Sequence, residues 1–182
     1  MKLALNFLII LLILTLISGI VWLIYNPSKY KNVDVDSIIT ENFKIYPNLY
    51  TSPDSFTDTA SLALPAMKFY TLGNYQLAME TFQKFEPQLE DDGYYNLYLG
   101  ICYFKVGYTN ISIGHFDESA ESFKMFKDKT TARWYMALAM LKANRIPEAK
   151  VIFEQLVNQN TEYKKRSQDI LKILDAKFWN IF

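Results

Sequence analysis

Three stretches of the chain repeat one pattern, and this repetition limits the possible folds more than any other feature of the sequence. They are GNYQLAMETFQKF, GHFDESAESFKMF and NRIPEAKVIFEQL. Each has a small residue four positions before a phenylalanine: Ala78 and Phe82, Ser119 and Phe123, Ala149 and Phe153. In a helix, residues four apart lie on the same face. The chain is therefore predicted to contain three copies of one helical unit.

A second apolar helix is predicted before each copy. It carries a small residue at one matching place, which is Ala66, Gly100 or Ala137. Ala66 and Gly100 are 34 residues apart, and Gly100 and Ala137 are 37 apart. The stretch LGICY adds an L-G-x2-Y element around Gly100. This period, this element and the A-x3-F pattern are typical of the tetratricopeptide repeat, a pair of antiparallel helices.

The clearest amphipathic pattern lies in PEAKVIFEQLV. Its apolar residues have the spacing of a helix with one buried face: Ala149, Ile152, Phe153, Leu156 and Val157. A further helix is expected in EYKKRSQDILKILDAKF, where it would cover the last apolar surface of a solenoid. Its apolar face holds Tyr163, Ile170, Leu171, Leu174 and Phe178. We predict an all-α fold in which residues 57–182 form a solenoid of about three helix-turn-helix repeats with a C-terminal capping helix. The tail KFWNIF is expected to dock on the last repeat, and docking on another protein is the alternative.

Two glycines of the second repeat, Gly107 and Gly114, are candidates for the turn between its helices. The pattern at Ser119 and Phe123 favours Gly114 and predicts an insertion of seven residues after Gly107. Seven residues are close to two helical turns, so the insertion would lengthen the first helix without changing its buried face. A loop is the alternative. The apolar residues of HFDESAESFKMFKDK predict that the second helix continues through Phe126.

Residues 3–25 contain no charged side chain. A helix of this length reaches about 34 Å, enough to cross a hydrocarbon core of about 30 Å. Trp22 and Tyr25 lie at its end, where aromatic side chains favour the membrane interface. The alternative is a cleaved signal peptide, whose apolar part is shorter, about 7–15 residues. We predict an uncleaved anchor over residues 1–28.

Residues 29–56 form a polar linker with prolines at Pro47 and Pro53. The stretch DSIITENF predicts one short helix in this linker, with Asp36 or Ser37 as its N-cap. The rest of the linker is expected to run along the folded domain as a tether.

Composition and motifs argue against catalysis and against nucleic-acid binding. The formal net charge is zero, and no dense basic run is present. With one histidine (His115) and one cysteine (Cys102), neither a zinc site nor an internal disulfide is expected. The sequence has no glycine-rich phosphate loop and no serine in a nucleophile elbow. We therefore expect no enzyme activity, no catalytic or cofactor-binding residue and no metal.

The remaining candidate site is a concave groove lined by the first helices of the repeats. Its positions are Ala63, Met67, Tyr70, Tyr94, Leu97, Ile101, Phe104, Lys105, Trp134, Leu138, Leu141 and Lys142. Only two of these residues are basic, so a clamp for a terminal carboxylate is not expected. An apolar helix or an extended peptide from a protein partner fits such a groove better. The alternative is that the same residues only pack on the linker or on the capping helix.

Four stretches resemble a bacterial family of membrane-anchored tetratricopeptide-repeat proteins. They are ENFKIYPN (41–48), AMETFQKF (78–85), ARWYMALAMLKANRIPEAKVIFEQLV (132–157) and YKKRSQDILKIL (163–174). With the predicted anchor, the resemblance covers nearly the whole chain. Charge alone leaves the orientation open, because Lys2 favours one orientation and Lys29 and Lys31 favour the other. The resemblance implies a single-pass inner-membrane protein whose repeat domain lies outside the cytoplasm.

Two functions fit this organisation. The first is a non-enzymatic scaffold of the cell envelope that recruits a protein partner. The second is regulation in transmembrane signalling, because some members of the family resemble anti-sigma regulators with a cytoplasmic zinc-binding domain. Only Met1 and Lys2 precede the predicted span, so that activity is not implied here. We expect the scaffold function.

Overall fold

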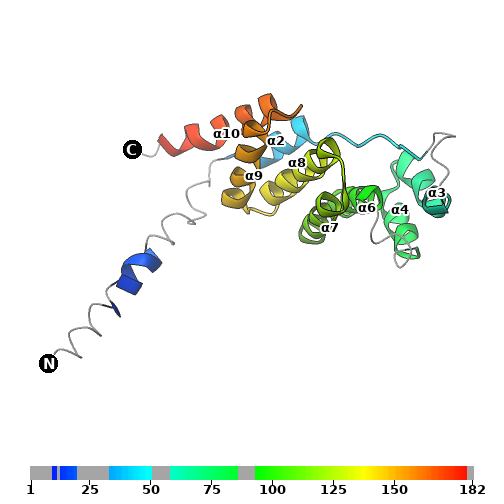
Figure 1. The fold of residues 1–182 in the computed structure, drawn as a ribbon, viewed down its shortest axis with the longest axis horizontal. Coiled ribbons are helices and arrows are strands. Elements are labelled where there is room, and N and C mark those ends of the chain that lie inside the picture. Colours follow the sequence, from blue (N-terminus) through cyan, green and yellow to red (C-terminus); the bar gives the residue numbers. More distant parts are fainter. Residues whose placement is uncertain (1–9, 12, 20–32, 51–57, 86–92, 180–182) are drawn as a thin grey trace.

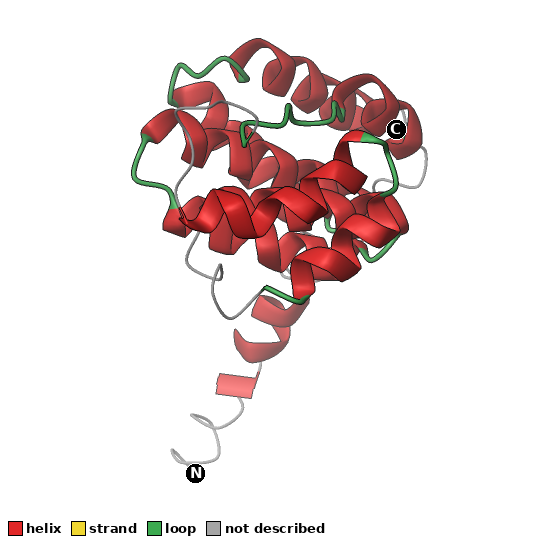
Figure 2. Cartoon of the chain, turned by 90° about the vertical axis from the view of Figure 1, so that its right-hand side faces the viewer, coloured by secondary structure: helices red, strands yellow, loops and turns green. Residues whose placement is uncertain are grey.

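The structure, a computed structural model, describes residues 10–11, 13–19, 33–50, 58–85 and 93–179 (Figure 1). Within these ranges all regular secondary structure is helical, and no strand occurs (Figure 2). The predicted all-α class is confirmed for this part of the chain. The helices that follow the N-terminal segment are α2 (Val35–Asn42), α3 (Asp58–Thr71), α4 (Tyr75–Gln83), α6 (Gly93–Val106), α7 (Thr109–Ser122), α8 (Phe126–Lys142), α9 (Ile146–Asn158) and α10 (Lys164–Trp179).

Six of these helices form three antiparallel pairs that stack side by side (Figure 1). We call α3, α6 and α8 the A helices and α4, α7 and α9 the B helices. Each B helix contacts the A helix of its own pair, and α4 and α7 also contact the A helix of the next pair. Helix α10 follows and contacts α9. This succession of neighbour contacts is the arrangement of a helical solenoid.

The same turn joins the two helices of each pair. Its central residue has a positive φ: 75° at Gly73, 96° at Gly107 and 60° at Asn144. The next amide donates to a carbonyl five residues back, at 2.9 Å for Asn74, 2.9 Å for Tyr108 and 2.8 Å for Arg145. This bond, together with the left-handed residue, is the Schellman ending of a helix. The turn of the second pair is therefore at Gly107.

The position of this turn corrects the register predicted for the second repeat. The residue five positions after the turn is small and the residue nine positions after it is a phenylalanine, and all six residues have an exposure of 0%. The pairs are Ala78 and Phe82, Ser112 and Phe116, Ala149 and Phe153. Ser112 and Phe116 thus replace Ser119 and Phe123 as the repeat pair. Seven residues are nearly two turns, so in an uninterrupted helix both pairs would lie on one face, and the sequence pattern alone does not separate them.

The predicted insertion after Gly107 is absent in either of its two forms. Helix α6 has 14 residues, the same as α3, and residues 109–122 are helical rather than a loop. The additional length lies in the B helix, because α7 has 14 residues and α4 has nine. Nor does this helix continue through Phe126 as predicted. Phe123 is extended with a ψ of 132°, and Phe126 begins α8.

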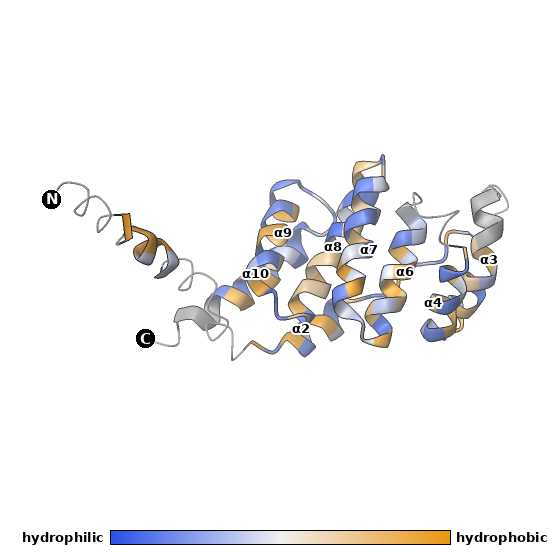
Figure 3. Ribbon diagram, turned by 90° about the horizontal axis from the view of Figure 1, so that it is seen from below, coloured by the Kyte–Doolittle hydropathy of each residue, from blue (hydrophilic) through white to orange (hydrophobic). Residues whose placement is uncertain are grey.

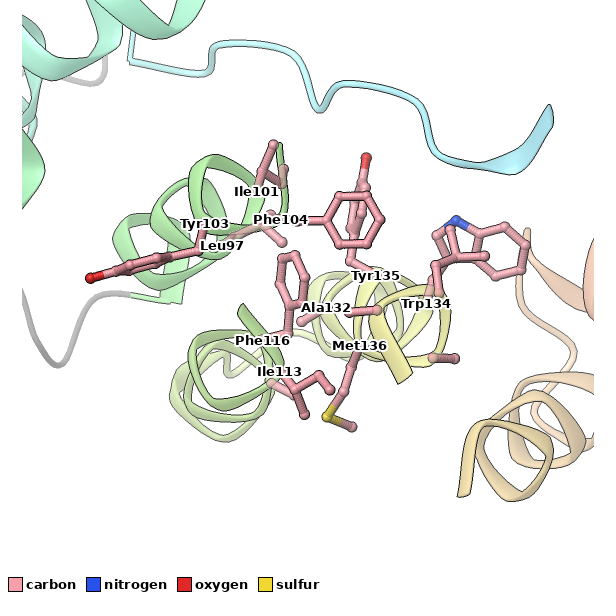
Figure 4. Packing of buried hydrophobic residues seen from close by; sticks show 14 of the residues in the cluster. Leu97, Ile101, Tyr103, Phe104, Ile113, Phe116, Ala132, Trp134, Tyr135 and Met136 are labelled. Atoms are coloured by element: carbon pink, nitrogen blue, oxygen red, sulfur yellow. The ribbon is translucent and has the colours of Figure 1, made fainter. Parts of the chain in front are cut away.

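Helix α6 is enclosed by protein on nearly every side. Gly93 and all residues from Tyr95 to Phe104 are buried. A Cβ atom at Gly100 would lie 2.7 Å from the Phe116 ring, so the absence of a side chain allows α7 to approach closely. Figure 4 shows Phe116 between α6, α7 and α8. The dense apolar sequence of α6 therefore reflects an inner helix with no wet face.

Helix α10 covers the end of the solenoid, as predicted. Tyr163, Ile170 and Leu174 are buried in the same core as the repeats. Lys150 of α9 forms an ion pair with Asp175 of α10. The side chains of residues 176–182, including Phe178 and the tail, lie outside the described part of the structure.

The predicted membrane anchor falls mostly on residues that the structure does not describe. Residues 10–11 and 13–19 are helical and mostly hydrophobic (Figure 3). Among the described residues, no helix is both long enough and apolar enough to cross a membrane.

Candidate functional site

Helix α2 lies against the last A helix, far from it in sequence. Asp34 is its N-cap, because its carboxylate accepts a hydrogen bond from the Ser37 amide at 3.0 Å. The sequence predicts Asp36 or Ser37 as the N-cap, and this prediction is wrong. Ile38 and Ile39 are buried, and α2 contacts α8. This contact fixes the start of the segment that follows.

Residues 43–50, which we call the strap, continue from α2 without forming a helix. The strap runs across α8, α6 and α3, which are the three A helices (Figure 1). Its aromatic side chains point toward these helices, since Tyr50 is buried and Phe43 and Tyr46 are half-buried. The remaining side chains of the strap are exposed or half-buried: Lys44, Ile45, Pro47, Asn48 and Leu49. We call the surface beneath the strap the A-helix surface; it is formed by Tyr70, Tyr94, Tyr98, Phe104 and Tyr135.

Aromatic rings make up most of the contact between the strap and this surface. The Phe43 and Phe104 rings stack with centroids 4.1 Å apart and an interplanar angle of 7°. Phe43 also meets Tyr135 edge-on at 5.2 Å. Offset stacked and edge-on ring pairs contribute about 0.5–1.5 kcal/mol beyond the area that they bury. The first strap residue is thus held between α6 and α8.

Two further aromatic side chains of the strap lie among tyrosines. The Tyr46 ring centroid is 6.4 Å from that of Tyr94, 6.0 Å from that of Tyr98 and 6.4 Å from that of Tyr135. The Tyr50 ring is 5.6 Å from the Tyr98 ring. The inward-facing residues of the strap therefore follow one another at spacings of three and four.

Tyrosine hydroxyls of all three A helices bind the main chain of the strap. Tyr135 of α8 donates to the Lys44 carbonyl at 2.6 Å, and Tyr70 of α3 donates to the Tyr46 carbonyl at 2.8 Å. Tyr98 of α6 donates to the Pro47 carbonyl at 2.8 Å and accepts from the Leu49 amide at 2.9 Å. In Figure 4 the Tyr135 hydroxyl points toward the strap. Each A helix thus contributes one tyrosine.

Burial keeps these hydroxyls in the form that can donate. It raises the pKa of both Tyr70 and Tyr135 above the ordinary tyrosine value. A buried phenolate would lose its hydration, so the neutral phenol is favoured. The hydrogen bonds to the strap are therefore formed across the whole physiological pH range.

The predicted groove residues separate into three groups and Trp134. Tyr70, Tyr94 and Phe104 contact the strap. Six others belong to the protein core rather than to an accessible surface, with exposures of 0–1%: Ala63, Met67, Leu97, Ile101, Leu138 and Leu141.

The third group consists of the two lysines, whose side chains are exposed. Lys142 Nζ is 5.7 Å from the Phe104 ring centroid and 4.0 Å from the Asp36 carboxylate, so it lies at the edge of the A-helix surface. Lys105 Nζ is 5.6 Å from the ring centroid of Tyr75 on α4, and that ring lies 5.7 Å from the Tyr70 ring. Lys105 is therefore near the Tyr70 end of this surface.

Trp134 faces away from the strap. Its ring stacks on Tyr163 at 4.9 Å and meets Phe153 edge-on at 5.7 Å. Figure 4 shows it directed toward the following helices. Trp134 thus joins α8 to α9 and to the start of α10, and the neighbouring Tyr135 faces the strap instead.

Sequence reasoning missed Tyr98 and Tyr135, which carry three of the four tyrosine hydrogen bonds to the main chain of the strap. The signal was available in part. Tyr70, Tyr94, Tyr98 and Tyr135 all fall on predicted A helices, and tyrosine is a buried hydrogen-bond donor. No sequence pattern indicates that the partners of these hydroxyls are main-chain atoms of residues 44–49.

The other polar and reactive side chains considered from the sequence, Cys102 and His115, lie in packed or hydrogen-bonded positions. No group of three or more His, Cys, Asp or Glu residues there could hold a metal ion. Cys102 is buried, and burial raises the pKa of its thiol well above the usual range, which disfavours the reactive thiolate. The Nδ1 atom of His115 is 3.0 Å from the side-chain oxygen of Asn96, and its ring stacks on Tyr103.

Comparison with known proteins gave a family match and a structural match. The tetratricopeptide repeat matches residues 131–162, which span most of α8, all of α9 and the turn before α10. No curated protein matches the chain. The fold is similar to that of the Yersinia enterocolitica type III secretion translocator chaperone SycD in its alternative dimer, with a TM-score of 0.53 and 22% identity, over 71% of this chain and 98% of the other. These matches support a tetratricopeptide-repeat protein with a solenoid fold.

Proposed function

We propose that this protein is a non-catalytic scaffold that holds its repeat domain at the membrane of the cell envelope and binds a protein partner along the A-helix surface. Tetratricopeptide repeats and other solenoids offer extended concave surfaces for protein binding. The observation that carries the proposal is the strap itself. It shows that the A-helix surface accommodates a non-helical aromatic segment through ring contacts and main-chain hydrogen bonds.

The partner that suits this surface is an extended peptide. The hydrogen-bonding groups of the surface are tyrosine hydroxyls directed at main-chain atoms, and its apolar contacts are aromatic rings. Lys142 lies at its edge and Lys105 near its Tyr70 end, with both side chains exposed. As in strand addition to a sheet edge, main-chain hydrogen bonds would supply affinity and side-chain pockets specificity, with tyrosine hydroxyls in place of the sheet edge.

Capture by a photoreactive side chain tests the partner site. A photo-crosslinking residue is placed at Lys105 or Lys142 of the full chain in its native membrane, and a matched control is placed at Glu154, which is exposed on α9. The proposal predicts that one protein is captured from both lysine positions and not from Glu154. Capture from Glu154 alone would move the partner site to the B helices.

The membrane location rests on the sequence of residues 3–25, which lack charged side chains. An apolar segment of this length is sufficient to span a bilayer.

Alkaline extraction of isolated membranes should leave the full chain in the membrane pellet, and a variant with Leu11→Lys and Leu14→Lys should be released. Protease added to cells with a permeabilised outer envelope should degrade the repeat domain. Protection of that domain would contradict the proposed extracytoplasmic orientation.

A further inference from the structure

Four hydrogen bonds between tyrosines of the A helices and the main chain of the strap depend on the conformation of the strap, not on its side chains. They join tyrosine hydroxyls to three carbonyls and one amide, those of Lys44, Tyr46, Pro47 and Leu49. Main-chain carbonyls and amides are present in every protein segment. Any segment that follows the same path could therefore make the same bonds.

Side-chain selection falls on the inward-facing positions of the strap and on Asn48, whose side-chain amide donates to the Thr71 hydroxyl of α3 at 3.4 Å. Phe43 stacks on Phe104, Tyr46 lies among three tyrosine rings, and Tyr50 is 7% exposed. By contrast, Ile45 and Leu49 are exposed by 40% and 39%. Pro47 binds Tyr98 through its carbonyl, so the lack of an amide hydrogen in proline removes no hydrogen bond to that tyrosine. The surface consequently reads two aromatic residues three apart and accepts a proline after the second.

We propose that the A-helix surface binds a partner segment of the form Phe-x-x-Tyr-Pro and that the strap competes with this segment as a resident ligand of the same chain. The inference rests on the scaffold function proposed above and adds the chemistry of the partner and the control of its access. A tethered segment has a high effective concentration at its own site. The apparent affinity for the partner is therefore reduced to the extent that the strap is bound.

The strap leaves an opening from which a competitor can begin to replace it. An open pocket lies where the strap passes the first helix pair. The strap bounds it on one side with Ile45, Tyr46, Pro47 and Asn48, and the end of α3 and the turn after it bound the other with Tyr70, Thr71, Leu72, Gly73 and Tyr75. The Tyr70 hydroxyl that binds the Tyr46 carbonyl thus sits at the pocket wall. An incoming segment could reach this hydroxyl before the rest of the strap is released.

Peptide binding to the full chain tests the competition. The probe is an isotope-labelled synthetic peptide with the strap sequence ENFKIYPNLY, and the control peptide has alanine in place of its phenylalanine and both tyrosines. The proteins are the natural chain, the variant F43A/Y46A and the matched variant K44A, which alters an exposed strap side chain and keeps its carbonyl. We expect F43A/Y46A to bind the probe at least about tenfold more tightly than the natural chain or K44A. The control peptide should bind none of them.

Equal or weaker binding by F43A/Y46A, with its helical circular dichroism unchanged, would overturn the proposal. A second measurement decides the matter if that variant does not fold. In the natural chain, excess probe should accelerate deuterium exchange at the Leu49 amide, which the Tyr98 hydroxyl holds at 2.9 Å. Unchanged exchange at a saturating concentration of probe would show that the strap is not replaceable.

The two proposals fail in different ways. If the labelled peptide replaces the strap and crosslinking from Lys105 and Lys142 captures no protein, the competition stands and the scaffold function is wrong. If a partner is captured and the peptide does not replace the strap, the scaffold stands and the partner binds without the strap-like pattern.

Discussion

Gly100 and Phe116 meet where the two helices of the second repeat approach most closely. A Cβ atom at Gly100 would lie 2.7 and 2.8 Å from ring carbons of Phe116, which is fully buried. The ring has little room to withdraw, because protein interiors are closely packed. The contact also fixes the register of the repeat, since it pairs Gly100 with Phe116 and not with Phe123.

The first prediction concerns this glycine. Gly100→Ala should reduce the free energy of unfolding by about 1–3 kcal/mol, because a methyl group is forced into a filled site. The matched control is Gly114→Ala, since a Cβ atom there meets nothing within 4 Å. Gly114 lies inside α7, so alanine should stabilise the helix by about 0.5–1 kcal/mol. Urea denaturation of the full chain in detergent measures both. Equal effects of the two substitutions would contradict the observed register.

A second prediction concerns the start of α2. Asp34→Ala removes the carboxylate that caps the Ser37 amide and should cost about 0.5–2 kcal/mol of stability. Asp36→Ala is the control, because Asp36 is exposed and its only ion pair among the described residues is a 4.0 Å contact with Lys142. That substitution should change stability by less than about 0.5 kcal/mol. A larger loss of stability for Asp36→Ala than for Asp34→Ala would make Asp36 the N-cap, as predicted from the sequence.

At the scale of elements, the helix pairs were predictable and the strap was only partly so. The spacing of apolar residues predicts the buried face of an amphipathic helix, as that of Ala149, Ile152 and Phe153 does for α9. The strap has no such period. Its binding depends on main-chain carbonyls, which every sequence contains, and on tyrosines that are distant in the chain. The sequence predicted that the linker runs along the domain, but gave no basis for its path.

The second repeat shows a different limit of sequence reasoning. Ser112 and Phe116 differ from Ser119 and Phe123 by seven residues, and all four are buried, with Phe123 at the C-cap just after α7. Ser119 donates to the Gly93 carbonyl at 2.7 Å, so the second pair has its own contact with α6. A heptad shift nearly preserves the face of a helix. The constant distance of seven residues from Ala66 to Gly73, Gly100 to Gly107 and Ala137 to Asn144 is the signal that would have identified the turn.

The third prediction tests the hydrogen bonds of the strap. Tyr98→Phe removes the hydroxyl that joins α6 to the Pro47 carbonyl and the Leu49 amide. Because a typical hydrogen bond contributes about 1 kcal/mol, the loss should be about 1–3 kcal/mol. Tyr108→Phe is the matched control, since Tyr108 is 52% exposed, and should change stability by less than about 0.5 kcal/mol. Denaturation midpoints of the two variants should differ clearly. Coincident midpoints would show that the strap is not held by this hydroxyl.

At the scale of the whole molecule, the strap joins repeats that otherwise contact only their neighbours. Its bonds link residues 24, 51 and 91 positions apart, to α3, α6 and α8 respectively. Stability in a solenoid is approximately a sum of repeat and neighbour terms. A segment that crosses all three A helices adds contacts of longer range, so the described domain should unfold more cooperatively than a solenoid without a strap.

The buried tyrosines give the fourth prediction, a loss of stability at alkaline pH. Burial raises the pKa of Tyr163 to about 12, whereas an unfolded tyrosine titrates near 10. The unfolded state thus releases its proton first as the pH rises. The stabilisation is fully present below about pH 10 and is lost as the pH rises toward about 12. Denaturation midpoints should be constant from neutral pH to about pH 9 and then fall. A midpoint that rises above pH 10 would contradict the burial of these hydroxyls.

The central claim is that residues 43–50 lie on the inner side of three stacked helix pairs. Nuclear Overhauser spectra of the isotope-labelled full chain test it most directly. The account predicts cross-peaks between the Phe43 and Phe104 rings, whose centroids are 4.1 Å apart, together with cross-peaks between Gly100 and the Phe116 ring. Cross-peaks for Gly100 and Phe116 without any for Phe43 and Phe104 would leave the repeats in place and show that the strap does not occupy the A-helix surface.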